Sequence, residues 1–271
     1  IRKVAVYFIS FIGSLVIIAS LLSLFYNLPY WYSKMLDFPR LQFFIVGVSC
    51  LILIIILTRK WKWPSILLCS GLIAAVLIQS IRIFPYWFGD KTVPDAGQNI
   101  SAENSFSMML ANVLITNRQS GRILEVVKES NPDIFIVMEV DQWWLDELKV
   151  LKKDYPYVIE QPNDVAYGMA LYSKLSLKKT EVKYLKHKNV SSFHSAVVLK
   201  SGKEFMLHSV HPVAPMPSDE YPDNIGDVEN ELIKVGEFVA NEKLPSMVAG
   251  DFNDVSWSNT CLLYTSPSPR D

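Results

Sequence analysis

Three long apolar runs occupy the first 88 residues of the chain. Residues 4–26, 41–57 and 64–81 contain no charged side chain. A helix needs about 20 apolar residues to cross the hydrocarbon core of a bilayer, and its backbone must be hydrogen-bonded internally there. One such run alone could be a core helix of a soluble protein, but three in succession predict a domain of three transmembrane helices over residues 1–88.

Basic residues around these runs predict their orientation. Five Lys or Arg lie before the first run or between the second and third: Arg2, Lys3, Arg59, Lys60 and Lys62. Three lie between the first and second runs or after the third, on the other side of the membrane: Lys34, Arg40 and Arg82. Because cytoplasmic loops are enriched in basic residues, we expect a cytoplasmic N-terminus. The lipid bilayer of an inner or plasma membrane is then a partner, and the C-terminal part lies outside the cytoplasm.

The rest of the chain has the pattern of a water-soluble domain. Residues 89–104 are polar, contain Gly and Pro, and are predicted to be a linker. Between 105 and 260 short apolar strands mix with amphipathic helices, and several consecutive strands have no helix between them, so the class is mixed α/β with some antiparallel pairing. Strands are predicted at 107–114 (ending at Asn112), 133–139, 155–160, 169–172, 180–185, 195–200, 204–210 and 246–249, and helices at 117–130, 142–153 and 225–239.

Charge divides the chain at the same place. Residues 1–88 hold eight Lys or Arg and one Asp, whereas residues 89–260 hold 17 Lys or Arg and 25 Asp or Glu. An acidic soluble part disfavours a protein that grips long nucleic acid by bulk charge. The three cysteines, Cys50, Cys69 and Cys261, all lie outside 89–260, so we expect neither a disulfide framework nor a thiolate metal site there.

Both ends of the chain look artificial. The last residues, 261–271 (CLLYTSPSPRD), resemble one reading frame of a sequencing adaptor; a natural Ser/Pro-rich tail is the alternative. We expect this tail to be non-native, which would leave the soluble domain incomplete near Thr260. The chain begins at Ile1 rather than Met, so we also expect that a preceding piece is absent.

The segment Gly250–Asn253 carries candidate chemistry after a predicted strand. In an extended chain residues i and i+2 point the same way, so Asp251 and Asn253 are predicted to project together while Phe252 points to the core. A turn at the end of a strand, where Gly, Asp and Asn are common, is the alternative interpretation.

Glu139, Asn112 and His211 also end or follow apolar strands. Each alone could be the first solvated residue beyond its strand. As a set with Asp251 and Asn253, they offer oxygen ligands suited to Mg²⁺ (or Mn²⁺), which is typically held by one or two carboxylates, waters and phosphate oxygens. The sequence has no HExxH or CxxC spacing, no GxxxxGK[ST] loop and no GxSxG elbow. His208, on the opposite side of its strand from His211, is expected to be packed, whereas His194 could line a cleft.

Four segments carry a resemblance to a known family. NVL (112–114), NPDIFIVMEV (131–140), HPVAP (211–215) and VAGDFNDVSWS (248–258) resemble, in this order, the endonuclease/exonuclease/phosphatase superfamily. The resemblance covers about residues 105–260 and is strongest to bacterial membrane-anchored members. It implies an α/β sandwich of two face-to-face β-sheets with helices outside, and Mg²⁺-dependent hydrolysis of phosphate esters.

The resemblance also implies a role for each candidate residue. Glu139 would bind the metal, with Asn112 beside it helping to place metal and phosphate. Asp251 would orient the attacking water, Asn253 would steady the phosphoryl oxygens and His211 would contact the phosphate. Metal and polar groups would together stabilise the charge that develops during in-line attack.

One departure from the family bears on activity. Its members end with an Asp-His pair for acid–base catalysis, and no residue after Asn253 matches that pair. Because such catalysis contributes about 10²–10⁴-fold, we expect the chain as given to be nearly inactive and its parent to be a membrane-anchored hydrolase. A non-catalytic, membrane-tethered interaction domain is the alternative. For a hydrolase, tethering and acidic charge favour lipid head groups or small phosphate esters over long nucleic acid.

Overall fold

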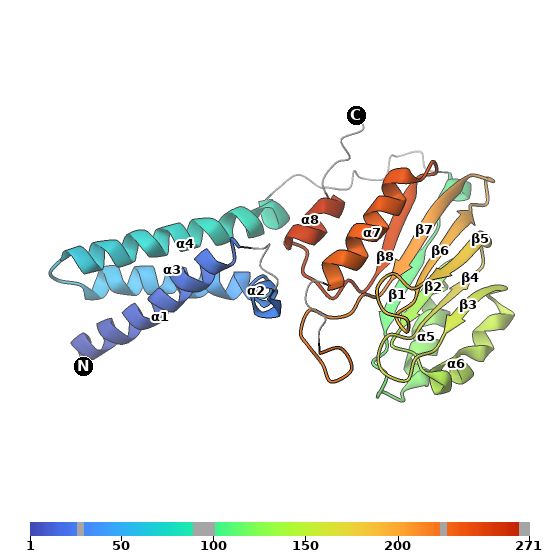
Figure 1. Cartoon of the computed structure of the whole chain (residues 1–271), viewed down its shortest axis with the longest axis horizontal. Coiled ribbons are helices and arrows are strands. Elements are labelled where there is room, and N and C mark those ends of the chain that lie inside the picture. The colour runs from blue at the N-terminus through green and yellow to red at the C-terminus, as the bar shows by residue number, and fades with distance from the viewer. Residues whose placement is uncertain (26–29, 89–100, 223–226, 266–271) are drawn as a thin grey trace. The chain divides into compact units, whose positions relative to one another are not determined.

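The computed structural model describes residues 1–25, 30–88, 101–222 and 227–265. The chain divides into two compact units, one made of residues 1–94 and 255–271 and the other of residues 95–254 (Figure 1). Positions 89–100 of the predicted linker (89–104) and positions 266–271 of the predicted tail lie outside the described residues. Residues 102–104 form a short 3₁₀ helix, Ala102–Asn104, which is capped by the side chain of Ser101.

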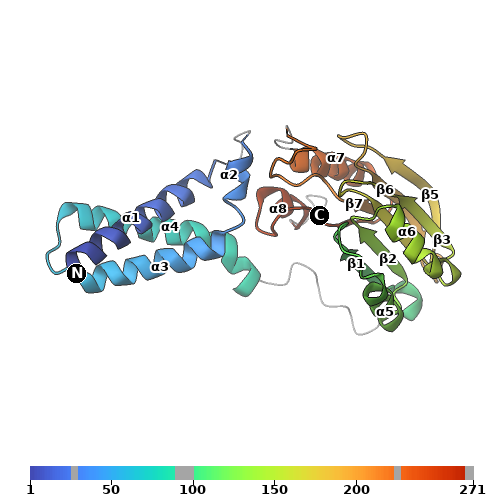
Figure 2. The ribbon, with the colours of Figure 1, turned by 90° about the horizontal axis from the view of Figure 1, so that it is seen from below.

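The first unit contains three helices long and apolar enough to cross a membrane. They are α1 (Arg2–Leu22), α3 (Arg40–Leu57) and α4 (Trp63–Phe88), with a short α2 (Trp31–Met35) between the first two. Figure 2 shows the three long helices packed side by side. The third continues past its predicted end at residue 81 because the apolar pattern was interrupted only by Arg82, and it runs through Pro85.

A buried polar cluster links these three helices at the start of α3. Arg40 is 1% exposed and pairs with Asp37. Its guanidinium donates to Gln79 Oε1 (3.0 Å) on α4 and to Ser23 Oγ (3.2 Å) after α1. A buried charge is costly unless paired and hydrogen-bonded, so the cluster fixes which faces of the helices meet.

The second unit is built on two four-stranded sheets, as the mixed α/β prediction expected. Sheet A has the order β1-β2-β4-β3 and sheet B the order β5-β6-β7-β8. The pairs β1/β2 and β7/β8 are parallel and the other four pairs are antiparallel. The strands are β1 (Met108–Asn112), β2 (Ile134–Met138), β3 (Tyr157–Gln161), β4 (Met169–Ser173), β5 (Ser176–Lys183), β6 (Ser192–Val198), β7 (Glu204–Val210) and β8 (Ser246–Gly250).

Strand β2 shows why the unit forms layers. All five of its residues are buried, and side chains alternate between its two faces. Ile134, Ile136 and Met138 belong to the core between the sheets, together with Phe193 and Leu207 of sheet B. The other face packs against helices: Phe135 and Val137 share a second core with Trp144 and Leu148.

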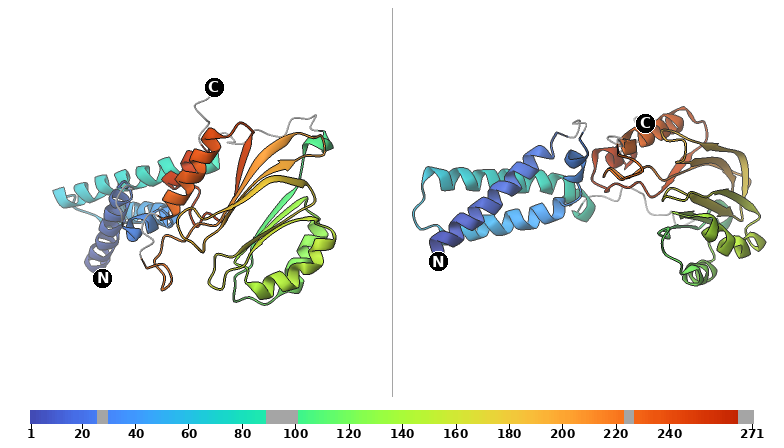
Figure 3. Two further views of the ribbon diagram at one scale, coloured as in Figure 1. Left: turned by 45° about the vertical axis from the view of Figure 1, so that its right-hand side comes forward. Right: turned by 60° about the horizontal axis from the view of Figure 1, so that its bottom comes forward.

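Helices cover the outer faces of both sheets (Figure 3). Sheet A is covered by α5 (Ser120–Ser130) and α6 (Gln142–Leu148), and sheet B by α7 (Asp227–Asn241), whose Phe238 ring lies 5.3 Å from the ring of His194. This two-sheet sandwich is the fold that the sequence resemblance implied. The predicted helix 142–153 is α-helical only to Leu148 and continues as 3₁₀ helix Lys149–Lys153. Ile225, the predicted start of the last helix, lies outside the described residues.

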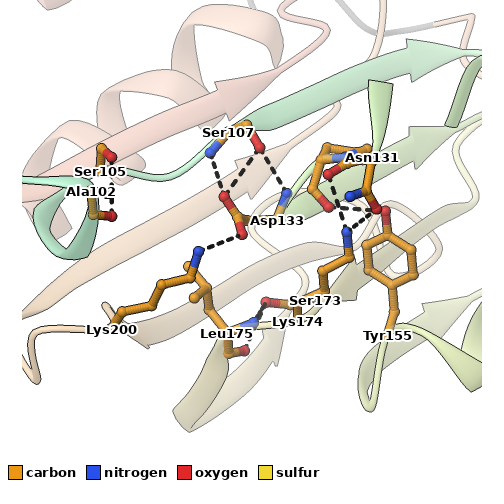
Figure 4. Close-up of polar contacts among 11 residues, drawn as sticks. Ala102, Ser105, Ser107, Asn131, Asp133, Tyr155, Ser173, Lys174, Leu175 and Lys200 are labelled. Carbon is orange, nitrogen blue, oxygen red and sulfur yellow. Dashed lines mark hydrogen bonds and ion pairs between the residues drawn. The ribbon is translucent and has the colours of Figure 1, made fainter. Parts of the chain in front are cut away.

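The amino ends of β1 and β2 are held by a structural network (Figure 4). Asp133 accepts hydrogen bonds from Ser107 N (2.8 Å) and Oγ (3.1 Å) and lies 3.5 Å from Lys200 Nζ. Burial raises the pKa of Asp133, but the bonds from Ser107 and the Lys200 charge outweigh it and the net pKa is lowered. This carboxylate therefore stays ionised and fixes the register of the two parallel strands.

Candidate functional site

The strand registers bring four predicted residues to the carboxyl ends of the two parallel pairs. Asn112 ends β1 opposite Met138 of β2, and Glu139 follows directly. In sheet B, Val210 of β7 pairs with Gly250 of β8, so His211 and Asp251 follow neighbouring strand ends.

The Asn112 amide joins carboxylates from both sheets. Its Nδ2 donates to Glu139 Oε1 (2.7 Å) and to Asp251 Oδ2 (3.2 Å), and its Oδ1 accepts from Leu114 N (3.0 Å). Asn112, Glu139 and Asp251 are called the carboxylate site below. Because the amide nitrogen faces both carboxylates while its oxygen is engaged by the backbone, Asn112 orients the acids in this geometry.

Glu139 stands on a strained backbone. It has φ +62°, and Leu114 across from it has φ +58°; bulky residues rarely adopt such values, which are concentrated at functional sites. The next residue, Val140, donates its N–H to Gly168 O (3.2 Å). A Cβ at Gly168 would lie 1.8 Å from Val140 O, so only glycine permits the contact that holds the Glu139 turn.

The segment after β8 turns rather than staying extended. Gly250 has φ +148°, a Cβ there would lie 1.8 Å from Val210 O, and Asn253 has φ +50°. The turn at the end of the strand, which the sequence left as the alternative, therefore describes this segment, since glycine and a left-handed asparagine bend the backbone on either side of Asp251. Asn253 N donates to Asp251 Oδ1 (3.0 Å), and Phe252 is half-buried rather than in the core.

Asn253 also connects two loops of the site. Its Nδ2 donates to Pro212 O (2.8 Å), directly after His211. The side chain of His211 is 3% exposed, and its Nδ1 has no hydrogen-bond partner among the described residues. Burial lowers the pKa of His211, outweighing the attraction of Asp251 and Glu139 for a charged ring. The imidazole is therefore neutral at pH 7.

Tyr167 belongs to the same region and was not predicted. Its ring lies 5.2 Å from that of His211, and its hydroxyl accepts from Ala214 N (3.3 Å). Burial raises the pKa of Tyr167, and the nearby Glu139 and Asp251 raise it further. The only sequence signal was its place beside Gly168, in a loop whose fold cannot be deduced from an apolar pattern.

Arg118 is a second residue that the pattern did not reveal. It lies between β1 and α5, and its Nη1 and Nη2 donate to Asp141 Oδ1 (3.0 Å) and Oδ2 (2.6 Å). The guanidinium carbon lies 4.6 Å from the centroid of the Trp143 ring. Arg118 lowers the pKa of Asp141 through these bonds, so the pair is ionised.

The remaining buried histidines lie elsewhere, in sheet B. His208 is packed as predicted. His194 lies inside β6 and is only 3% exposed: its Nδ1 is 2.7 Å from His208 Nδ1, and its Nε2 is 2.9 Å from Ser192 Oγ.

The donor set of the carboxylate site suits a hard divalent cation. Within the described ranges no three His, Cys, Asp or Glu side chains converge as a metal group; the site offers the two carboxylates as ligands, while the Asn112 amide holds them in place. That set excludes a closed zinc cage, but it fits Mg²⁺ or Mn²⁺, which complete their coordination with waters and phosphate oxygens.

Comparison with known families decides the relationship of the chain. The sequence model of the Endonuclease/Exonuclease/phosphatase family matches residues 104–270. The chain belongs to this family. The resemblance found in the sequence is thereby confirmed, and endonuclease/exonuclease/phosphatase homologues are hydrolases acting on phosphoesters.

Solved structures that match part of this chain include three from different sources. Humanized D. rerio TDP2 is 15% identical (TM-score 0.48), with 61% of this chain and 68% of that chain covered. The human nocturnin catalytic domain is 19% identical (TM-score 0.47; 59% and 69% covered), and sphingomyelinase C from Streptomyces griseocarneus is 13% identical (TM-score 0.48; 60% and 71% covered). A comparison with curated proteins gives no match.

Proposed function

We propose that this family member is a membrane-anchored, Mg²⁺-dependent phosphoric-ester hydrolase, acting as a phosphodiesterase, phosphatase or nuclease-like enzyme. The observation that carries the proposal is the Asn112 amide, which holds Glu139 and Asp251 of opposite sheets within 2.7 and 3.2 Å of one donor. Two carboxylates held together in this way favour a cation that can compensate their charge. Mn²⁺ is the alternative metal.

A divalent cation bound there would activate water and offset negative charge on the phosphoryl group. Glu139 is the ligand we assign to that cation, and Asp251 orients the attacking water. Asn112 keeps both acids in place. The neutral imidazole of His211, whose Nδ1 has no partner within the described part of the chain, contacts a phosphoryl oxygen, and Asn253 fixes the loop of His211 through Pro212 O.

The substrate class and the location follow from the rest of the chain. Three helices able to cross a membrane and an acidic soluble part favour lipid head groups or small phosphate esters over long nucleic acid. The excess of basic residues on one side of the helices supports a location of the hydrolase unit outside the cytoplasm. Cysteine labelling of an introduced Ser101→Cys in intact cells tests this orientation: a label that enters only after lysis refutes it.

Glu139→Gln tests the proposed function directly. The intact chain in detergent micelles is assayed for hydrolysis of p-nitrophenyl phosphate and its bis-ester, with Mg²⁺ and with chelator. Because no residue after Asn253 matches the family's Asp-His pair, we expect only residual Mg²⁺-dependent turnover, so Mg²⁺ binding is measured by calorimetry on the same samples. Glu139→Gln should abolish the residual turnover and weaken Mg²⁺ binding at least about tenfold, because the charge of a metal ligand is lost while the side-chain volume stays.

Glu204→Gln is the matched control. Glu204 begins β7, at the opposite end of the strand from His211, and pairs with Lys178 at 2.7 Å on the surface. It should retain parental turnover. Unchanged turnover and Mg²⁺ binding in Glu139→Gln would contradict the metal assignment, and a folded chain that binds no Mg²⁺ would favour the non-catalytic interaction domain.

A further inference from the structure

Arg118 presents an exposed positive charge and is held by Asp141, two residues after Glu139 of the carboxylate site. We propose that it is a specificity-determining residue, which binds a second anionic group, a carboxylate or phosphate, on a substrate whose scissile phosphate lies at the carboxylate site. This inference rests on the proposed function and names a feature of its substrate.

The covalent chain links Glu139 to Asp141, the residue that holds the Arg118 guanidinium. Arg118 is bonded through two N–H groups to Asp141, at 3.0 and 2.6 Å. Asp141 follows Glu139 by two residues, a span of at most about 7 Å. Arg118 follows β1 and Asp141 follows β2, at the same edge of sheet A where Asn112 and Glu139 lie, so one substrate can extend from Glu139 towards the guanidinium.

The guanidinium has a fixed orientation and retains N–H groups that can donate to a ligand. Asp141 is itself fixed, because its Oδ1 also accepts from Trp144 N (2.9 Å) at the start of α6. Trp143 supports one face of the guanidinium. Of five N–H donors, Nη1 and Nη2 each give one to Asp141, and among the described residues no further bond takes the others. The side chain is 46% exposed, so an incoming anion can reach them.

Charge explains why this donor would select substrates. Glu139 and Asp251 offset the two charges of a divalent cation, so the carboxylate site with its metal is close to neutral. The ion pair with Asp141 is also neutral overall, yet its outer edge presents only donors. Hydrogen bonds to an ionised partner are the strong ones, and arginine binds carboxylate and phosphate through paired donors.

A matched pair of phosphodiesters tests the inference. Glycerophosphoserine and glycerophosphoethanolamine differ by one carboxylate, and their binding to the intact chain in detergent with Mg²⁺ is measured by calorimetry. We expect glycerophosphoserine to bind about tenfold more tightly, as one charge-assisted contact gives, and Arg118→Met to make the two affinities equal. Arg118→Lys should keep only part of the preference, because it retains charge but not the planar fork.

Asp141→Asn separates recognition from a purely structural clamp. Asn is an equally good helix cap, so α6 should remain while Arg118 loses its ion pair and keeps its charge. We expect the preference for the serine ester to persist or increase. If Arg118→Met and Asp141→Asn both lower thermal stability and neither changes the affinity ratio, Arg118 is a clamp and the inference is refuted.

The same measurement compares a lipid head group with a soluble phosphodiester as the ligand. Micelles doped with phosphatidylserine or phosphatidylethanolamine carry the same two head groups on diacylglycerol. An Arg118-dependent preference seen only in micelles identifies a lipid substrate, and one seen equally with the free esters identifies a soluble one. If the unsubstituted chain binds both esters equally, the Arg118 inference alone is overturned. If it shows no Mg²⁺-dependent binding of either ester, the proposed function is overturned as well.

Discussion

The buried histidine pair of sheet B predicts that the second unit loses stability in mild acid. His194 and His208 are 3% and 2% exposed, and their Nδ1 atoms lie 2.7 Å apart, a contact that one proton can bridge when both rings are neutral. A second proton at this contact would place two donors face to face. Charged groups near the pair are Lys183 and Glu181 beside His194, and Glu242 beside His208.

The size of the effect follows from proton binding. Burial, and then the neighbouring His208, lowers the pKa of His194 to about 4, against about 6.5 for an unfolded chain. Between these values only the unfolded state takes up the proton, so stability is complete above pH 6.5 and falls as the pH drops towards 4. From pH 7 to pH 5 this group alone removes about 2 kcal/mol. Burial lowers the pKa of His208 as well, which acts in the same direction.

Hydrogen exchange of β6 and β7 measures this loss in the intact chain. After correction for intrinsic exchange rates, protection of these strands should fall about 30-fold between pH 7 and pH 5, because a loss of about 2 kcal/mol changes the unfolding equilibrium constant about 30-fold. Exchange at the imidazole C2 positions of the four histidines follows the pKa values directly. His194→Asn combined with His208→Asn keeps a donor and acceptor near the Nδ1 positions and removes the titration.

The double variant should be less stable at pH 7, because two rings are lost, but its protection should change little with pH. His187→Gln, outside the pair, should leave the acid-induced loss intact. Equal protection of the parent at pH 7 and pH 5, or an unchanged pH dependence in the double variant, would refute the reasoning.

Two further substitutions test the close contacts of each unit. Gly250→Ala places a Cβ 1.8 Å from Val210 O at φ +148°, so we expect the free energy of unfolding to fall by at least about 2 kcal/mol. Hydrogen exchange measures this as lowered protection in β7 and β8. Gly121→Ala is the control, because a Cβ at this helical position meets open space, and it should leave stability unchanged or raise it. Arg40→Ala leaves the buried Asp37 unpaired and should lower the free energy of unfolding by about 3–5 kcal/mol, measured by thermal unfolding in detergent. Adding Asp37→Asn removes the unpaired charge, so the double variant should regain most of this stability.

The sequence predicted the sandwich well where burial and periodicity coincide. The predicted strand 204–210 has the bounds of β7, and the run 133–139 contains β2, because apolar alternation directly records which face is buried. It failed where buried groups are polar. β6 begins at Ser192 rather than 195, since Ser192 and His194 are buried but hydrogen-bonded to each other, and hydrophobic pattern cannot register such positions.

The candidate site was predictable in its residues and not in its geometry. Polar residues after apolar strands located the strand ends, but the direction of the Asn112 amide and the bend at Asn253 depend on positive φ values and on backbone bonds between loops. Arg118 and Tyr167 lie in loops, where no periodicity exists to indicate which side chains converge.

The bond between Asn112 and Asp251 joins positions 139 residues apart in the chain, from the first strand of the unit and the last. Such a distant pairing closes late, after the entropy of the intervening loop has been lost. A nascent chain with only sheet A assembled holds one acid without the other. Any chemistry that needs both is withheld during synthesis and begins only when β8 has joined β7.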